Sequence, residues 1–225
     1  MNTPVEIINL LTEFKFSQQD TNILHQQIDD LFDICQELTH NYDESHDVNH
    51  HLEVLRNALS IMIQLESKSI ELITLVIFAS TLHDIVDTKY PTDVGIKRRK
   101  LIIFLNERSK IVNKNDVIWV IDNISFSNEV KFGYPTHPNP IVQLARDIVS
   151  DADKLESIGD IGIHRCTIYT KAINPNLSSQ DINKLVIQHC HDKLIKIKDQ
   201  YMRTMPGKTM AIPRHDIIAK FLLMN

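Results

Sequence analysis

The chain has 225 residues, of which 43% are hydrophobic and 24% are charged, and its formal net charge is −5 at pH 7. This length is enough to bury a substantial hydrophobic core without disulfides or structural metals. The acidic balance argues against strong nucleic-acid binding, because such proteins usually carry a clear excess of basic residues.

The three cysteines are Cys35, Cys166 and Cys190, and no two of them form a CxxC pair. Their odd number and wide spacing favour neither a disulfide framework nor a zinc ribbon, so we expect a reducing, cytoplasmic environment. The N-terminal stretch MNTPVEIINLLTEFKF lacks the features of a signal peptide. The longest apolar-rich run, 72–82, is far shorter than the ~20 residues that cross a bilayer, so no membrane association is expected.

The predicted elements are all helices, because apolar residues recur at helical spacing and the chain has only five glycines and eight prolines. In chain order the predicted helices span 20–38, 50–66, 69–86, 92–108, 116–124, 141–158, 179–202 and a short 215–223. Ser69, Thr92 and Ser178 are the expected N-caps. The segment 125–140 holds three prolines and a glycine, which predicts a long loop.

These helices predict an all-α fold class with a single helical domain. We expect residues 23–225 to form that domain together with its C-terminal helices, and residues 1–22 to form an N-terminal segment that packs on it. No internal repeat or low-complexity linker marks a further domain. The oligomeric state is left open by the sequence.

The predicted helix 69–86 has an unusual polar end. One apolar stripe of this helix ends in His83, and the neighbouring stripe ends in Asp84. Either the two side chains satisfy the helix end through hydrogen bonds, or they bind a metal ion whose charge offsets the cost of burying a carboxylate. Imidazole and carboxylate ligands together suit a divalent ion such as Mn²⁺, Fe²⁺ or Zn²⁺.

Two further stretches can supply more ligands. His46 and His50 lie four residues apart on one helix face, whereas His51 points elsewhere and is expected to be exposed. Asp151 and Asp153 follow an apolar run, and Asp151 is expected to cap the helix or to support a ligand.

The pattern H…HD…D, filled by His50, His83, Asp84 and Asp153, resembles the signature of the HD-domain metal-dependent phosphohydrolases. The resemblance extends to HDVNHHLEVLRNA, LHDIVDTKY, IDNISFS, VSDADKLESIGDIGIHRC and QHCHDKLIKIKDQYMRTMPGKTMAIPRH. In this order, these motifs are similar to those of the small stand-alone branch that includes nucleotide pyrophosphohydrolases. The resemblance covers the chain from about residue 23 to its end and implies the helical HD-domain fold.

The resemblance implies that one divalent ion is bound by four side chains, His50, His83, Asp84 and Asp153. Mn²⁺ is the ion we expect, with Mg²⁺, Fe²⁺ and Zn²⁺ as alternatives. Binuclear relatives need extra histidines between the HD doublet and the last aspartate, and only His137 lies there, so a single ion is favoured. Relatives often have arginine at the position of Glu53, in an HxxRV pattern. Because this chain differs there, the detailed substrate contacts of the family are not assigned to it.

Asp87 is the predicted catalytic residue, because it follows His83 by four residues and can reach a water beside the ion. The stringent-response nucleotide hydrolases are similar in carrying an acid at that place; the alternative is that Asp87 only ends the helix. The matched motifs contain six candidate substrate-binding residues: Lys89, Arg165, Lys193 and Arg214 as cations, and His46 and His189 with no role derived. The basic run 97–100 is expected to be a solvated surface, because adjacent helical positions fan around the axis.

Together these residues predict an enzyme: a divalent-metal-dependent phosphohydrolase that cleaves a phosphoanhydride or phosphate ester of a small-molecule nucleotide. The first expectation is a nucleoside triphosphate pyrophosphohydrolase. The alternatives are a 5′-nucleotidase-type phosphomonoesterase and a non-catalytic nucleotide-binding HD module. Retention of all four ligand positions favours the enzyme over the module.

Overall fold

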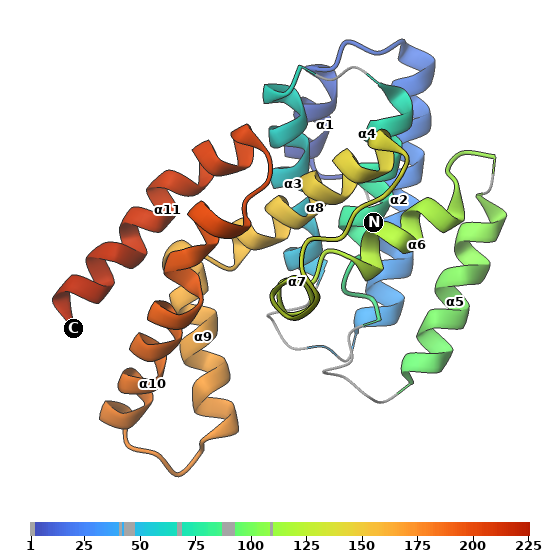
Figure 1. The fold of residues 1–225 in the computed structure, drawn as a ribbon. Coiled ribbons are helices and arrows are strands. Elements are labelled where there is room, and N and C mark those ends of the chain that lie inside the picture. The colour runs from blue at the N-terminus through green and yellow to red at the C-terminus, as the bar shows by residue number, and fades with distance from the viewer. Residues whose placement is uncertain (1–2, 41, 43–47, 67–68, 87–92, 109) are drawn as a thin grey trace. The chain divides into compact units, whose positions relative to one another are not determined.

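The computed structural model describes residues 3–40, 42, 48–66, 69–86, 93–108 and 110–225. Every regular element within these residues is a helix, so the predicted all-α fold class is confirmed. The chain groups into two compact units, residues 1–152 (unit 1) and 153–225 (unit 2), which are described separately (Figure 1). The predicted division between residues 22 and 23 stays a prediction.

Unit 1 contains the helices α1 (Val5–Thr12), α2 (Gln18–Thr39), α3 (Val48–Gln64), α4 (Ile70–Leu82), α5 (Val94–Glu107), α6 (Lys114–Asp122), α7 (Phe126–Phe132) and α8 (Pro140–Glu156), the last of which continues into unit 2. Helices α2 to α5 alternate in direction, and the further helices pack around them (Figure 1). Because α2 to α5 alternate, the C-terminal ends of α2 and α4 and the N-terminal ends of α3 and α5 lie at the same end of the unit (Figure 1).

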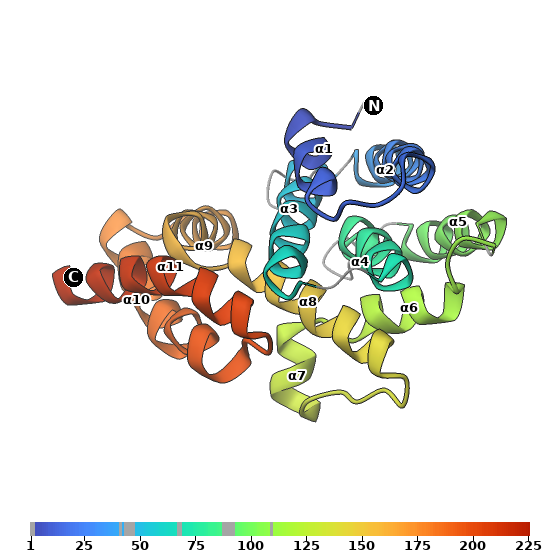
Figure 2. The ribbon, with the colours of Figure 1, turned by 90° about the horizontal axis from the view of Figure 1, so that it is seen from above.

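Helix α4 forms the centre of unit 1 because it is apolar on every side. All residues from 72 to 82 are buried, and the helix contacts α2, α3 and α6 (Figure 2). The Thr74 hydroxyl donates to the Ile70 carbonyl at 2.7 Å, which satisfies a buried polar group within the helix. A helix enclosed in this way holds the residues at its C-terminal end in fixed positions, and its C-cap is His83.

The segment 125–140 differs from the long loop that we predicted. Its first half is helix α7, which begins after Ser125, whose hydroxyl accepts a hydrogen bond from the Asn128 amide. Gly133 ends the helix with φ +85°, a left-handed conformation that favours glycine. The loop prediction is therefore wrong for 126–132.

Arg146 of α8 is buried and forms hydrogen bonds with residues before and within α7. Arg146 is completely buried, and its Nε donates to the Asn123 carbonyl at 2.8 Å. Its Nη2 donates to Glu129 Oε2 at 2.7 Å, and Glu129 is itself buried. Further along, the Tyr134 hydroxyl donates to Asp147 Oδ2 at 2.7 Å. These bonds join α7 and the chain after it to one face of α8.

Unit 2 contains the end of α8 and a group of further helices. They are α9 (Gly159–Ile173), α10 (Ser179–Asp192), the 3₁₀-helix η1 (Leu194–Lys196), the π-helix η2 (Ile197–Tyr201) and α11 (Met205–Met224). Helices α9 and α10 pack together, and α11 contacts α9, α10 and both short helices. Helix α9 was not predicted, and the predicted helix 179–202 breaks after residue 192. Helix α11 begins at residue 205, ten residues before the predicted start at 215.

Side-chain caps set several helix starts. The Ser69 hydroxyl accepts from the Leu72 amide, and the Ser178 hydroxyl accepts from the Asp181 amide, so both predicted N-caps are confirmed. Thr92, the third predicted N-cap, lies outside the described residues. Thr204 caps α11 by accepting from the Gly207 amide at 3.0 Å.

Two glycines allow close packing at the start of α9. Gly159 has φ +81°, and a Cβ there would lie 3.2 Å from Cβ of Arg214 on α11. A Cβ on Gly162 would lie 2.2 Å from the Ser157 carbonyl oxygen, which no side chain can tolerate. The GDIG sequence therefore permits α9 to turn tightly away from α8 and to approach α11.

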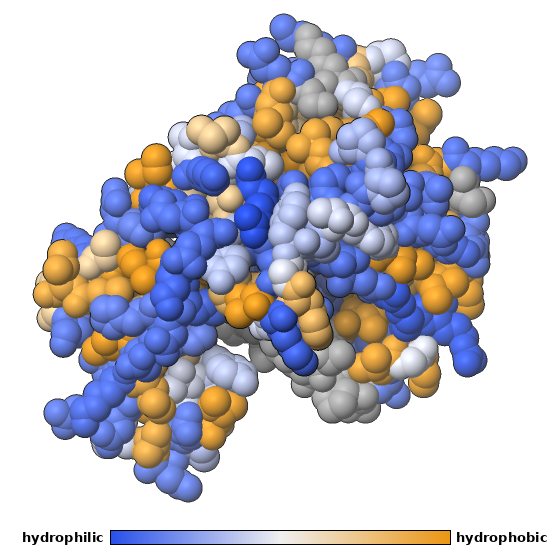
Figure 3. Space-filling view, in the orientation of Figure 1, coloured by the Kyte–Doolittle hydropathy of each residue, from blue (hydrophilic) through white to orange (hydrophobic). Residues whose placement is uncertain are grey.

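Several apolar side chains remain on the surface of unit 2 (Figure 3). Tyr169 on α9 is 60% exposed, and Leu223 at the end of α11 is 88% exposed. The buried core of this unit is small and includes Ile182, Val186, Leu194, Ile197 and Ile218. Across the described residues of both units, no helix combines the length and apolar character that a membrane span requires.

Candidate metal centre

Helices α3 and α4 bring two histidines together. His50 lies in the first turn of α3, and His83 follows the last residue of α4. The two helices pack against each other in opposite directions, so the start of one lies beside the end of the other (Figure 1). Asp84 comes next in the chain and adds a carboxylate to the same place.

The three side chains converge at short distances. His50 Nε2 lies 3.2 Å from His83 Nε2, and Asp84 Oδ2 lies 3.5 Å from the first nitrogen and 3.4 Å from the second. Ligands bound at ~2.0–2.1 Å to one ion lie about 3.0–3.4 Å apart at octahedral or tetrahedral angles. The spacing of this group, which we call the HHD group, therefore matches the ligand shell of a single cation.

The histidine tautomers also fit a metal site. His83 Nδ1 lies 2.8 Å from the Ser80 carbonyl and donates its proton there, so in the neutral ring Nε2 carries a lone pair. His50 Nε2 and His83 Nε2 lie 3.2 Å apart, a distance that two bare nitrogens do not hold without a proton or a cation between them. Both imidazoles are almost completely buried, with side-chain exposures of 3% for His50 and 1% for His83. A divalent cation satisfies this donor set.

The carboxylate of Asp84 is the accessible member of the group, with 26% of its side chain exposed. Desolvation by burial alone would raise the pKa of this carboxyl. The positive charge of His83, with hydrogen bonds from His50 and His83, outweighs desolvation and holds the pKa of Asp84 well below its usual range. Asp84 is therefore ionised at neutral pH, which a metal ligand requires.

His51 departs from the expectation of an exposed histidine. It is completely buried, and its ring centre lies 5.1 Å from that of His83 and 5.8 Å from that of His50. The physical reason is that α3 buries more than one stripe, so the residue next to the ligand position also faces the interior. His51 thus forms a wall of the HHD group.

The fourth predicted ligand, Asp153, lies near the C-terminal end of α8 and is half-buried. It is the first residue of unit 2, whereas the HHD group belongs to unit 1. Its role as a ligand stays a prediction. Asp151, two residues earlier, is completely buried.

Three predicted site residues lie outside the described residues: His46, Asp87 and Lys89. The predicted catalytic role of Asp87 and the predicted substrate contacts of His46 and Lys89 therefore stay predictions.

Two predicted substrate-binding arginines share one acidic partner in unit 2. Arg214 Nη1 lies 3.5 Å from Glu156 Oε1, and Arg165 Nη1 donates to the Glu156 carbonyl at 3.4 Å. The Glu156 carboxylate is buried, whereas the Arg214 side chain is 27% exposed. Both guanidinium groups therefore belong to the junction of α8, α9 and α11.

The other two predicted substrate-binding residues of unit 2 lie on α10. Lys193 is the C-cap of this helix and is half-buried, and His189, whose carbonyl accepts the Lys193 amide at 2.9 Å, is exposed. A cation at a helix C-terminus is stabilised by the helix dipole. The substrate role of both residues stays a prediction.

Glu53, where relatives often have arginine, pairs with an arginine of its own helix. Glu53 accepts a hydrogen bond from Arg56, and Arg56 also lies 3.2 Å from Glu6 on α1. The carboxylate at this position thus takes part in an ion-pair chain between α3 and α1.

Lys97 contradicts the expectation of a solvated basic run. Its residue exposure is 8%, and its Nζ lies 3.9 Å above the centre of the Tyr42 ring. Sequence reasoning missed this site, although Lys97 precedes the buried Leu101 by four residues and the buried Phe104 by seven. That helical spacing was the available signal.

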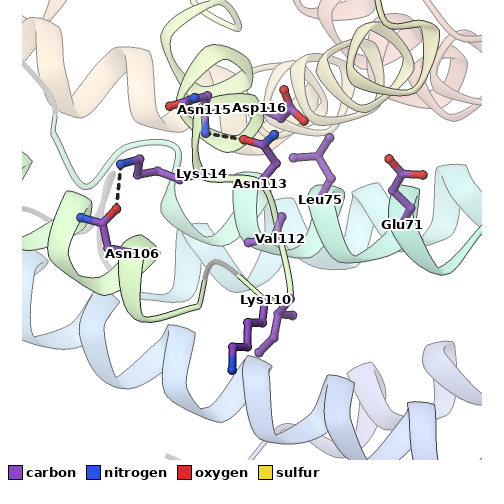
Figure 4. A pocket seen from close by; sticks show the side chains of 10 residues that line it. Glu71, Leu75, Asn106, Lys110, Val112, Asn113, Lys114, Asn115 and Asp116 are labelled. Carbon is purple, nitrogen blue, oxygen red and sulfur yellow. Dashed lines mark hydrogen bonds between the residues drawn. The ribbon is translucent and has the colours of Figure 1, made fainter.

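A pocket of about 520 Å³ lies elsewhere in unit 1, among the start of α4, the end of α5 and the start of α6 (Figure 4). In it, Lys114 Nζ donates to Asn106 Oδ1 at 2.7 Å, and Asn113 caps α6 by accepting from the Asn115 amide. These two bonds engage Lys114, Asn106 and Asn113 within the pocket wall, and the pocket shares no residue with the HHD group.

Among protein-family models, none matches the chain. Two curated relatives are similar in sequence. YpgQ of Bacillus subtilis, an uncharacterised protein, is 26% identical over 147 residues, which cover 64% of this chain and 67% of YpgQ. L803 of Acanthamoeba polyphaga mimivirus, also uncharacterised, is 29% identical over 140 residues, which cover 57% of this chain and 54% of L803. The chain thus spans about half the length of the mimivirus protein.

Solved structures show the fold. A protein of Lactobacillus plantarum matches with a TM-score of 0.68 at 22% identity, covering 88% of this chain and 94% of its own. YpgQ in complex with ADP matches with a TM-score of 0.65 at 22% identity and the same coverage. An HD-superfamily hydrolase of Bacillus thuringiensis matches with a TM-score of 0.62 at 23% identity, again covering 88% and 94%. The chain therefore has an HD-like fold, as its His and Asp pattern predicted.

Proposed function

We propose that this protein is a divalent-metal-dependent phosphohydrolase that cleaves a phosphoanhydride or phosphate ester of a nucleotide, and specifically a nucleoside triphosphate pyrophosphohydrolase. The observation that carries the proposal is the HHD group, in which two imidazole nitrogens and a carboxylate oxygen lie 3.2–3.5 Å apart. This donor set suits a divalent cation, and enzymes use such cations to activate water against phosphate.

Two comparisons support the proposal. The Bacillus thuringiensis protein of the same fold is described as a hydrolase, and YpgQ of the same fold binds ADP. The ADP complex favours a nucleotide as the ligand class of this chain.

We assign the metal to four side chains, the HHD group and Asp153. Mn²⁺ is the proposed ion, because a mixed nitrogen and oxygen donor set with carboxylates suits it. A divalent ion bound there would polarise a phosphate oxygen and lower the pKa of an attacking water. Asp87 would accept the proton of that water, since it follows His83 by one helical turn in the sequence.

Phosphate binding is assigned to the cationic candidates. Lys89, Arg165, Lys193 and Arg214 would contact phosphate oxygens, with His46 and His189 as further contacts. Guanidinium groups bind phosphate through two parallel hydrogen bonds, and ammonium groups act as point charges. Arg214 can serve this role because its partner Glu156 orients it while part of the guanidinium side chain stays exposed.

The test begins with the purified protein, stripped of metal by a chelator and then supplied with Mn²⁺. Nucleoside mono-, di- and triphosphates are added one at a time, and released phosphate and pyrophosphate are measured separately. Pyrophosphate from triphosphates supports the proposal, and phosphate from 5′-monophosphates supports the phosphomonoesterase instead. Tight nucleotide binding with no metal-dependent release from any substrate contradicts an enzyme and supports a binding module.

Two substitutions separate metal binding from turnover. Asp84→Ala removes one ligand of the HHD group, so both Mn²⁺ uptake and hydrolysis should be lost. Asp87→Ala should retain Mn²⁺ uptake, measured by calorimetry, while its turnover falls at least about a hundred-fold, the scale of a lost general base. The matched control is Asp216→Ala, which removes the aspartate of another His-Asp dipeptide whose side chain is 73% exposed. Unchanged Mn²⁺ uptake in Asp84→Ala would contradict the assigned site.

A further inference from the structure

Lys97 is a buried cation near one end of α5. The residue is 8% exposed, and its side chain belongs to the stripe of α5 that faces the interior, together with Leu101 and Phe104. Its ammonium group lies 3.9 Å above the centre of the Tyr42 ring, within the range of a cation–π interaction. The aromatic face therefore holds the ammonium in a defined position.

The neighbouring basic residues have carboxylate partners, whereas Lys97 has none within ion-pair distance among the described residues. Arg98 Nη2 lies 2.6 Å from Asp122, and Lys100 Nζ lies 2.5 Å from Glu37. Burial lowers the pKa of Lys97, and the charge of Asp93 opposes this only in part. A buried charge is costly without a counter-ion, and groups whose pKa is shifted by burial concentrate at functional sites.

A short chain of contacts connects Lys97 to the HHD group. The Tyr42 hydroxyl donates to the Ile85 carbonyl at 2.8 Å, and Ile85 follows Asp84 directly in the chain. The C-terminal end of α4 and the N-terminal end of α5 lie at the same end of unit 1 (Figure 1). One tyrosine side chain, one hydrogen bond and one peptide bond thus connect the Lys97 ammonium to Asp84 of the HHD group.

We infer that Lys97, positioned by Tyr42, binds a phosphate group of the substrate other than the phosphate held at the HHD group. The inference rests on the proposed function and narrows its substrate class to nucleotides that carry a chain of at least two phosphates. An ammonium suits this role because it pairs with phosphate oxygens as a point charge whatever their orientation. A nucleoside monophosphate has no second phosphate to reach it.

The test compares ligands that differ in phosphate number. Binding of a nonhydrolysable nucleoside triphosphate analogue and of the matching monophosphate is measured by calorimetry with Mn²⁺ present, for the wild type and three variants. Lys97→Met keeps the length of the stem and removes the charge, and Lys97→Arg keeps the charge. Lys100→Met is the control, because it removes a lysine of the same helix that is paired with Glu37 at the surface. Thermal unfolding of each variant confirms that it is folded.

In Lys97→Met we expect the Kd of the triphosphate analogue to rise about ten-fold or more, the scale of one lost charge-assisted contact. The Kd of the monophosphate should change less than about two-fold, and Lys97→Arg and Lys100→Met should keep the wild-type ratio of the two affinities. Equal losses for both ligands, or no loss for either, would overturn the inference. Because the readout is binding, it decides the role of Lys97 even if the wild type releases no phosphate, which would contradict the proposed function alone.

Discussion

His83 uses its two ring nitrogens for different purposes. Nδ1 donates to the Ser80 carbonyl one turn earlier in the chain, and Nε2 faces His50 and Asp84. The backbone of α4 therefore selects the tautomer that offers a lone pair to a cation. This explains how a helix that is apolar on every side can end in a polar doublet.

The resemblance of the pattern H…HD…D to the HD-domain phosphohydrolases predicted that His50, His83 and Asp84 lie together, and the structure brings these three side chains together. The sequence did not predict the burial of His51 or Lys97. Both residues adjoin charged or polar neighbours in the chain, and their burial depends on which face of α3 or α5 meets the rest of unit 1. Which face of a helix is buried depends on tertiary packing, and local composition does not determine it.

The raised pKa of the Cys190 thiol predicts that the stability of the protein depends on pH. Burial, with a smaller contribution from Cys166, raises the pKa of Cys190 from 9.0 to about 11. As the pH rises above 9.0, the unfolded chain ionises this thiol first, so the stability that the neutral thiol contributes is lost between pH 9.0 and about 11. Urea midpoints measured across this range should therefore fall more steeply for the wild type than for Cys190→Ala. Parallel curves for the two proteins would refute this assignment.

At the scale of elements, local signals predicted the helices whose starts are capped by their own side chains. Ser69 and Ser178 marked α4 and α10 correctly. Helix α9 was missed because two glycines at its start weaken the helical signal, and packing against α10 and α11 supplies what local propensity lacks. The predicted helix 215–223 begins too late, because Pro213 lies inside α11, whose N-cap is Thr204.

Helix α7 depends on the buried ion pair between Arg146 and Glu129. Arg146→Met would remove the guanidinium that pairs with the buried Glu129 carboxylate, so the free energy of unfolding should fall by about 3–5 kcal/mol. The double variant Arg146→Met, Glu129→Met should recover much of this loss, because neither charge remains buried. Urea unfolding followed by circular dichroism measures both. Arg98→Met is the control, because its pair with the half-exposed Asp122 should contribute less than about 1 kcal/mol.

At the scale of the whole molecule, the all-α class was predictable and the two compact units were not. The division falls between residues 152 and 153, inside α8. A domain boundary can be predicted from a sequence when a polar or glycine-rich linker separates the two domains. Here the boundary lies inside a continuous helix, which contains no such linker. Asp153 is the first residue of unit 2, whereas the HHD group lies in unit 1. The proposed role of Asp153 as a ligand is therefore tested by a substitution of this residue alone.

Metal binding should stabilise the whole protein. A ligand that binds only the folded state at a free concentration of 100 times its Kd stabilises that state by about 2.7 kcal/mol. Adding Mn²⁺ to the chelator-treated protein should therefore raise its thermal midpoint. The rise should be absent in Asp84→Ala, intact in Asp216→Ala and reduced in Asp153→Ala if Asp153 is the fourth ligand. A full rise in Asp153→Ala would remove this residue from the ligand set.

The position of His83 at the end of α4 has a further electrostatic consequence. Peptide dipoles of a helix add up to roughly half a negative charge at its C-terminus, and α4 ends at this doublet. That negative end, with the ionised Asp84, attracts a cation and repels a phosphate as long as no cation is bound. Binding should therefore be ordered. The ion binds first, and its positive charge then attracts the phosphate groups that the helix terminus alone repels.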